Sequence, residues 1–134
     1  MDLDVNWLAI ITATALHQAL GALWYGVLFK KLWLNEMGMS DEDVAGQGPG
    51  AEMFIGIAAS LASTVVMAVI LTAFPDPDVT DGVVLGALAG VGFVLMSNLM
   101  NGAYEQRSSR LSILFGAYYT LGLIAVGAVL GAWR

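Results

Sequence analysis

Six polar side chains stand out because they lie in stretches of the sequence that are otherwise apolar and carry almost no charge. They are His17, Gln18, Ser97, Asn98, Asn101 and Glu105. His17 is the only histidine of the chain, and the last four side chains follow the three- and four-residue spacing that makes one stripe along a helix. A polar group inside a bilayer is costly unless it is paired, so these side chains should face protein or water.

Two interpretations of these six groups are open. Asn98 lies deep enough to meet His17 or Gln18 if their helices touch, which would make a proton-sensitive or solute-contacting site. The same contacts could instead fix the packing of the helices, at about 0.5 to 2 kcal/mol each. We favour packing, because a lone histidine without a buried carboxylate is a poor proton relay. Glu105 is expected to form an interfacial ion pair with Arg107 rather than to carry protons.

Composition excludes several other chemistries. The 134 residues include no cysteine, which removes thiol catalysis, disulfides and cysteine-bound metals. With one histidine and no nucleophile beside a base, we expect no metal site, no cofactor and no enzyme activity. The 5 Lys and Arg against 11 Asp and Glu leave a formal charge of −6. This charge argues against nucleic acid as a partner, because binding the phosphate backbone needs cations.

The elements that must carry the polar groups are four long uncharged stretches, at residues 6–29, 53–74, 82–104 and 111–133. Each reaches about the 20 residues of a transmembrane helix, and a helix of the first stretch would be roughly 36 Å long. The chain is therefore expected to be all-α, an integral membrane four-helix bundle that forms one domain over residues 1–134. The first stretch should be retained rather than cleaved as a signal peptide, because acids precede it and lysines follow it.

The basic residues predict how this bundle sits in the lipid bilayer. In an up-down-up-down array the first and third connections share one face, and they hold Lys30, Lys31, Arg107 and Arg110. Only Arg134 falls on the other face. Because cytoplasmic loops carry the excess of Lys and Arg, we predict a multi-pass protein of the cell membrane with both termini outside, in an extracytoplasmic position.

The connections carry recognisable turn signals. Residues 30–52 are expected to form a cytoplasmic loop with a short interfacial helix, in which a capping box at residues 40–43 opens a helical turn and residues 46–50 reverse the chain. Two prolines within residues 74–82 should end the second helix. The three aspartates there could suggest a calcium loop, but the segment lacks the glycine and distal glutamate of an EF-hand. A solvated outer turn is therefore preferred.

Small and aromatic residues predict how the helices pack. Glycines at four-residue spacing let helix backbones approach closely in lipid, and the third and fourth stretches contain Gly82, Gly86, Gly90, Gly127 and Gly131. These packing faces exceed what four mutually contacting helices need, so we expect a homo-oligomer. Trp24, Tyr25 and Trp33 are expected to anchor the inner end of the first helix at the headgroup boundary.

Three segments resemble one known family. Residues 21–33 carry the pattern Gly-x-x-Trp-Tyr-Gly-x-x-Phe-x-Lys-x-Trp, residues 37–43 read Met-Gly-Met-Ser-Asp-Glu-Asp, and residues 127–133 read Gly-Ala-Val-Leu-Gly-Ala-Trp. Together they look like the family catalogued as domain of unknown function 1761, over essentially the whole chain. The resemblance implies a small four-span membrane protein. It implies no established activity and carries over no catalytic or binding residue.

Two functions follow as hypotheses. The first is a homo-oligomeric permease or channel-like protein, which would need a hydrated path along His17, Asn98 and Asn101. The second is a non-transporting structural or accessory membrane protein that binds another membrane protein through its glycine faces, which a dry, sealed bundle with exposed glycine ridges left over would favour. A lipid-acting enzyme is a distant third, because it would need a cluster of charged residues at one membrane level that the sequence does not contain.

Overall fold

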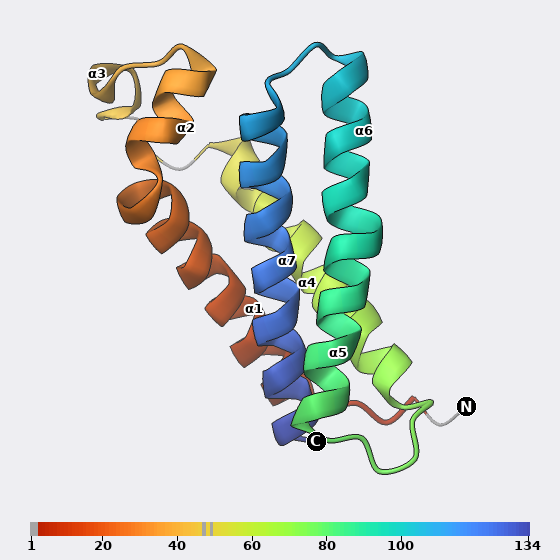
Figure 1. The fold of residues 1–134 in the computed structure, drawn as a ribbon. Coiled ribbons are helices and arrows are strands. Elements are labelled where there is room, and N and C mark those ends of the chain that lie inside the picture. The colour runs from red at the N-terminus through yellow and green to blue at the C-terminus, as the bar shows by residue number, and fades with distance from the viewer. Residues whose placement is uncertain (1–2, 47, 49) are drawn as a thin grey trace.

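The computed structural model describes residues 3–46, 48 and 50–134, and among them it contains helices and no strand (Figure 1). In this part of the chain, four helical stretches are long and apolar enough to cross a membrane: Trp7–Leu28, Ala51–Leu71, Val79–Tyr104 and Ser109–Ala132. These findings confirm the all-helical class and the four candidate spans. Gln47 and Pro49 of the predicted chain reversal lie outside the described residues.

The first span is not a single α-helix. α1 (Trp7–Leu23) starts at Asn6, whose side-chain oxygen accepts hydrogen bonds from two free backbone N–H groups at 3.0 and 3.1 Å. The π-helix η1 (Trp24–Leu28) follows, and the backbone N–H of Phe29 donates to the carbonyl of Trp24, five residues back. A π turn widens the helix and changes the direction of the side chains after it, and such turns often occur at functional sites. Here it falls on the Trp-Tyr-Gly of the family pattern.

Two short helices form the connection after the first span. α2 (Lys30–Met37) ends at Gly38, whose φ of 67° is the left-handed conformation that a glycine adopts at a helix end. α3 (Asp41–Val44) begins with the predicted capping box, in which Ser40 and Asp43 exchange hydrogen bonds between side chain and backbone N–H. Lys30 and Asp41 form an ion pair at 3.0 Å that fastens α3 to α2.

This capping box should respond to acid. The backbone N–H of Ser40, and after it the Ser40 hydroxyl, hold the pKa of the Asp43 carboxyl below its usual value. A depressed carboxyl pKa means that the charged carboxylate stabilises the turn above its unfolded-state pKa of about 3.9, and that this support is lost as the pH falls through the folded value. In a carbon-13 titration, Asp43 should ionise below that value in the native chain and closer to it in Ser40→Ala. Equal titration curves would contradict the assignment.

The remaining spans are α4, a broken third span and α7. α4 (Ala51–Leu71) ends before the two prolines, three residues earlier than the predicted stretch. The third span consists of α5 (Val79–Ala89), the π-helix η2 (Gly90–Leu95) and α6 (Met96–Tyr104), and α7 covers Ser109–Ala132. α5 begins three residues before the predicted stretch, because Asp78 and Asp81 form a second capping box.

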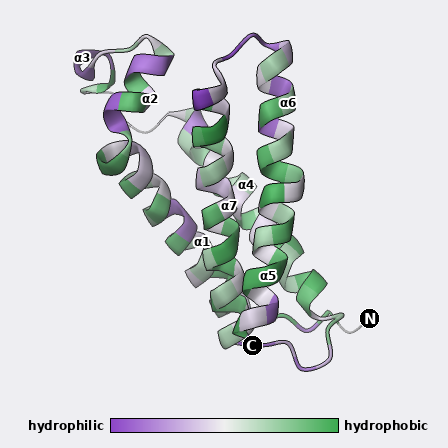
Figure 2. Ribbon diagram, viewed as in Figure 1, coloured by the Kyte–Doolittle hydropathy of each residue, from purple (hydrophilic) through white to green (hydrophobic). Residues whose placement is uncertain are grey.

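α7 is the central helix of the arrangement. It contacts α1, α4, α5, η2 and α6, so it lies between the first span and the third (Figure 1). The main apolar core gathers side chains of α1, α4 and α7, among them Ile10, Met67 and Val126. Hydrophobic residues also cover the outward sides of the spans, whereas hydrophilic residues concentrate on α2, α3 and the turn between α6 and α7 (Figure 2). An apolar outside is what a bilayer-embedded bundle needs.

The predicted packing glycines all act between the third span and α7. A Cβ added at Gly82 would fall on the backbone of Gly127, and one at Gly86 would fall on the backbone of Leu123. At Gly90 it would lie 2.6 Å from the Thr120 methyl group. These contacts bring two helix backbones together inside one copy of the chain. The glycine ridges are therefore already used within the bundle and do not by themselves call for a second copy.

Candidate functional site

His17 lies in a closed aromatic setting between α1 and α7. Its side chain is 0% exposed, and its ring centroid lies 4.7 Å from that of Tyr119 and 5.3 Å from that of Tyr118. Gly122 faces the same ring so closely that a Cβ there would overlap the Nε2 atom. Within the described residues neither ring nitrogen has a hydrogen-bond partner. A buried polar group without a partner is unusual and carries a free-energy cost, so this histidine calls for a functional or structural explanation.

Two of the predicted anchor residues, Trp24 and Tyr25, pack around the same tyrosine ring, Tyr118, as His17 does. Trp24 is 8% exposed and packs on Phe29, with ring centroids 4.5 Å apart. Its indole N–H also has no partner among the described residues. Tyr25 meets the rings of Trp33 and Tyr118 at 5.3 and 5.2 Å. We call His17, Trp24, Tyr25, Tyr118 and Tyr119 the aromatic cluster.

Tyr118 connects the aromatic cluster to the backbone of α1. Its hydroxyl donates a hydrogen bond to the carbonyl oxygen of His17 at 3.3 Å. Gly21 makes room for this contact, because a Cβ at that position would lie 2.7 Å from the hydroxyl oxygen. The first glycine of the family pattern is thus explained by a close approach of α7 to α1.

Gln18 is turned toward α4, away from the aromatic cluster. Its side-chain nitrogen donates to the Ser60 hydroxyl at 2.7 Å and to the carbonyl of Gly56 at 3.3 Å. At the contact between α4 and α7, the hydroxyls of Ser63 and Tyr119 lie 2.9 Å apart and join the two helices. His17 and Gln18 are neighbours in sequence, but His17 lies at the contact of α1 with α7 and Gln18 at the contact of α1 with α4.

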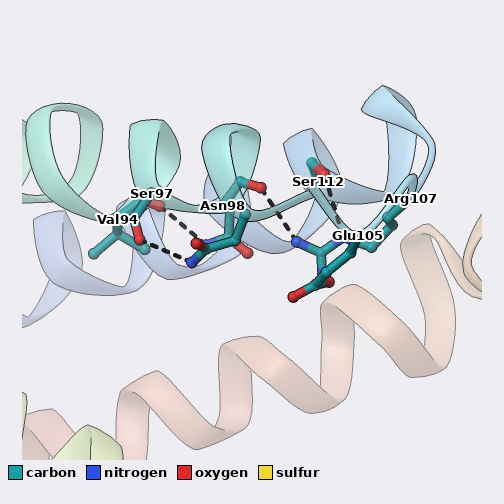
Figure 3. A network of polar contacts seen from close by, with 7 residues as sticks. Val94, Ser97, Asn98, Glu105, Arg107 and Ser112 are labelled. Atoms are coloured by element: carbon teal, nitrogen blue, oxygen red, sulfur yellow. Dashed lines mark hydrogen bonds and ion pairs between the residues drawn. The ribbon is translucent and has the colours of Figure 1, made fainter. Parts of the chain in front are cut away.

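The polar stripe of the third span forms its own contacts on the other side of α7. Asn98 donates to the carbonyl of Val94 at 3.0 Å (Figure 3). Asn101 donates to the Ser97 hydroxyl at 3.3 Å. In the part of the chain that the structure describes, no hydrogen bond joins this stripe to His17 or Gln18. The six predicted polar residues thus fall into two separate groups, because α7 lies between their helices.

Arg107 holds the turn between α6 and α7. Its guanidinium donates to the carbonyl of Asn98 at 3.2 Å and to the Ser112 hydroxyl at 3.3 Å, and it pairs with Glu105 at 3.4 Å (Figure 3). The guanidinium carbon also lies 5.3 Å from the ring centroid of Phe115. The predicted Glu105 to Arg107 ion pair is confirmed, and it belongs to a clamp that joins α6 to α7.

Loss of this clamp should be measurable. Arg107→Met keeps the apolar stem but removes the charged hydrogen bonds, so we expect the unfolding free energy to fall by about 1.5 to 3 kcal/mol. Unfolding of the detergent-solubilised protein, followed by circular dichroism, gives the value. Arg110→Met is the matched control, because Arg110 is exposed and has no ion-pair or hydrogen-bond partner among the described residues. Equal losses in the two variants would refute a special role of Arg107.

A groove of about 340 Å³ opens between α1 and α4. Thr14 and Gln18 lie among its lining residues, and the rest are apolar: Ile11, Ala15, Ile57 and Leu61. The groove faces sideways and suits a hydrocarbon chain or an apolar helix better than a hydrated solute. A smaller cavity of about 220 Å³ lies at the end of the bundle that holds Asn6 and Arg134.

The comparison with protein families gives a match over nearly the whole chain. Residues 8–131 match the family described as Protein of unknown function (DUF1761). The chain belongs to this family. The resemblance carried by residues 21–33, 37–43 and 127–133 is thereby confirmed. No curated protein and no solved structure matches the chain.

Several members of the site in this DUF1761 chain are not evident from sequence. Tyr118, Tyr119 and Gly122 lie in an apolar stretch where nothing separates them from ordinary lipid-facing residues. The sequence does contain a signal for Gly122: it lies four residues after Tyr118, a spacing that places the two residues on one helix face. The burial of Trp24 was also unexpected, since a tryptophan at the end of a span is typical of the headgroup boundary.

Proposed function

We propose that this DUF1761 chain is a non-transporting structural or accessory membrane protein, without enzyme activity, whose own bundle does not conduct solute. The observation that supports this most is the sealing of the bundle interior. His17 is fully buried among tyrosine rings, and the hydroxyls of Thr14, Thr64 and Thr120 donate to carbonyls of their own helices at 2.7 to 2.8 Å. A conducting path would need such groups to line water instead.

The proposal includes the placement of the chain in the membrane. The turn after α6 and the connection after the first span lie at the same end, since the Ser108 hydroxyl donates to the Glu36 carboxylate. This contact supports the up-down-up-down arrangement, with the four basic residues of these connections gathered at one face. Under the positive-inside rule that face is cytoplasmic, and both termini are extracytoplasmic.

Reconstitution into liposomes tests the absence of conduction. Vesicles that contain the purified protein, a trapped pH-sensitive dye and a range of small solutes should be no more permeable than protein-free vesicles between about pH 5 and 8. Empty vesicles made with the same detergent provide the control. A flux that rises in proportion to protein content and shows a preference among solutes would overturn the proposal.

Transport is the second candidate, and one observation favours it. Both ring nitrogens of His17 lack a partner among the described residues, so they are free to bind a proton or a polar solute if the bundle opens. If flux is found in the liposomes, His17→Leu should abolish its pH dependence. Persistence of the pH dependence in that variant would exclude His17 as the titrating group and would remove the support for this candidate.

A further inference from the structure

The contact of α1 and η1 with α7 buries two polar side chains for which the described residues offer no partner. Both ring nitrogens of His17 lack a hydrogen bond, and so does the indole N–H of the buried Trp24. Both side chains pack on the ring of Tyr118, with centroid distances of 5.3 and 6.3 Å. A buried polar group without a partner gains free energy when it meets one, so both side chains favour separation of the two helices.

A proton on His17 would make the closed contact much less favourable. A neutral imidazole has one N–H donor and one acceptor, whereas the protonated ring has two donors and a positive charge. The titratable groups that face the ring are the hydroxyl-bearing rings of Tyr118 and Tyr119 from α7. Both hydroxyls are already engaged, that of Tyr118 with the carbonyl of His17 and that of Tyr119 with the Ser63 hydroxyl of α4.

The helices around the ring supply no charge at its level. α1 and η1 contain no Asp, Glu, Lys or Arg. The charged residue of α4 is Glu52, about 12 Å along the helix from Ser60, which contacts Gln18. The charged residue of α7 is Arg110, about 12 Å along the helix from Tyr118. An enclosed imidazolium would have neither a counter-charge nor acceptors, so the closed contact excludes the proton.

We infer that acid opens this contact, because protonation of His17 separates α1 from α7 at the aromatic cluster. The opened crevice offers the protonated ring polar neighbours, since the amide of Gln18 and the hydroxyls of Ser60 and Ser63 lie at its α4 side. Residues 51–56 of α4 are all exposed, so the first turns of this helix do not cover the contact and leave a route for water. A charge inside a bilayer requires such a wet, polar setting.

Linkage between proton binding and opening sets the size of the response. A histidine in water titrates at about pH 6.5. Because only the open contact binds the proton, the ratio of open to closed chains is constant well above this pH and rises about tenfold for each pH unit below it. From pH 7.5 to 4.5 the ratio should rise about a hundredfold. The inference goes beyond the proposed function and does not depend on it, because the contact can open with or without a conducted solute.

Spin labels on a chain that naturally lacks cysteine can measure the opening. Leu16→Cys on α1 and Leu121→Cys on α7 carry the labels, since both positions are exposed and lie next to His17 and Gly122 in the sequence. In lipid nanodiscs, pulsed dipolar spin resonance should give one separation at pH 7.5 and a growing share of a longer one toward pH 4.5. His17→Gln keeps a polar side chain that does not titrate, so it should give the short separation throughout.

A second label pair separates this opening from general acid unfolding. Leu88→Cys on α5, which is also exposed, is combined with the same Leu121→Cys, and the separation across the contact of α5 with α7 should not change with pH. The inference fails if the first pair does not respond to pH, if His17→Gln responds as the native chain does, or if the second pair responds too. His17→Leu takes the place of His17→Gln if that variant does not fold. A flux in the liposome assay bears on the proposed function alone.

Discussion

Gly82→Ala and Gly127→Ala should each lower the unfolding free energy by about 3 kcal/mol or more. A Cβ at either position falls on the backbone of the other glycine, so no rotation of a side chain can relieve the overlap. Overpacking by a methyl group usually costs about 1 to 3 kcal/mol when side chains can move aside, and here α5 and α7 would have to separate. Chemical unfolding of the protein in detergent micelles measures the loss, as does the temperature at which it aggregates.

The control for this pair is Gly56→Ala. Gly56 lies in the second turn of α4, in another apolar span, and nothing lies within 4 Å of the position that its Cβ would occupy. Because alanine is the better helix former by about 1 kcal/mol, this variant should be as stable as the native chain or slightly more stable. If all three substitutions had the same effect, α5 and α7 would not be in contact at Gly82 and Gly127.

Gly122→Ala should destabilise the bundle through His17, by about 1 to 3 kcal/mol. The added methyl group would overlap the imidazole, and the ring has little freedom to move because Tyr118 and Tyr119 pack against it. The penalty differs from that at Gly82 because a side chain, and not the backbone, is the obstacle. Unfolding in detergent micelles again gives the value.

A second substitution can remove this obstacle. In a His17→Ala background the imidazole is absent, so Gly122→Ala should cost little and can even fill part of the space left behind. The double-mutant cycle should therefore show an interaction energy of the same size as the single penalty. Additive effects of His17→Ala and Gly122→Ala would show that the two residues do not touch. The aromatic cluster would then not be packed against Gly122 as the structure has it.

The positions of the helices could be predicted from the sequence because a membrane span depends on local composition. A stretch such as residues 111–133 is apolar over its full length, and its length alone matches the thickness of the hydrocarbon core. Helix ends were also predictable where a side chain contacts its own backbone. The capping box at residues 40–43 is of this kind, and so is the end of α4 before Pro75.

The polar groups could not be assigned to one another in the same way. The periodicity of the third span places Ser97 and Asn101 on one stripe, but nothing in it says which neighbour the stripe meets. The prediction that Asn98 could reach His17 required the first and third spans to touch, and α7 lies between them. Two π-helical turns add to the difficulty, since each changes the direction of the side chains that follow it.

The sequence by itself therefore determined the all-helical class, the four candidate spans, the capped turns and the family. These depend on hydropathy, length and contacts within a few residues. Only the tertiary structure decided that His17 packs against Tyr119 and Gly122, that Trp24 is buried, and that the glycines of the third span are used against α7. The reason is that the order of helices around a bundle is set by how their surfaces fit together, and one helix's periodicity does not contain that information.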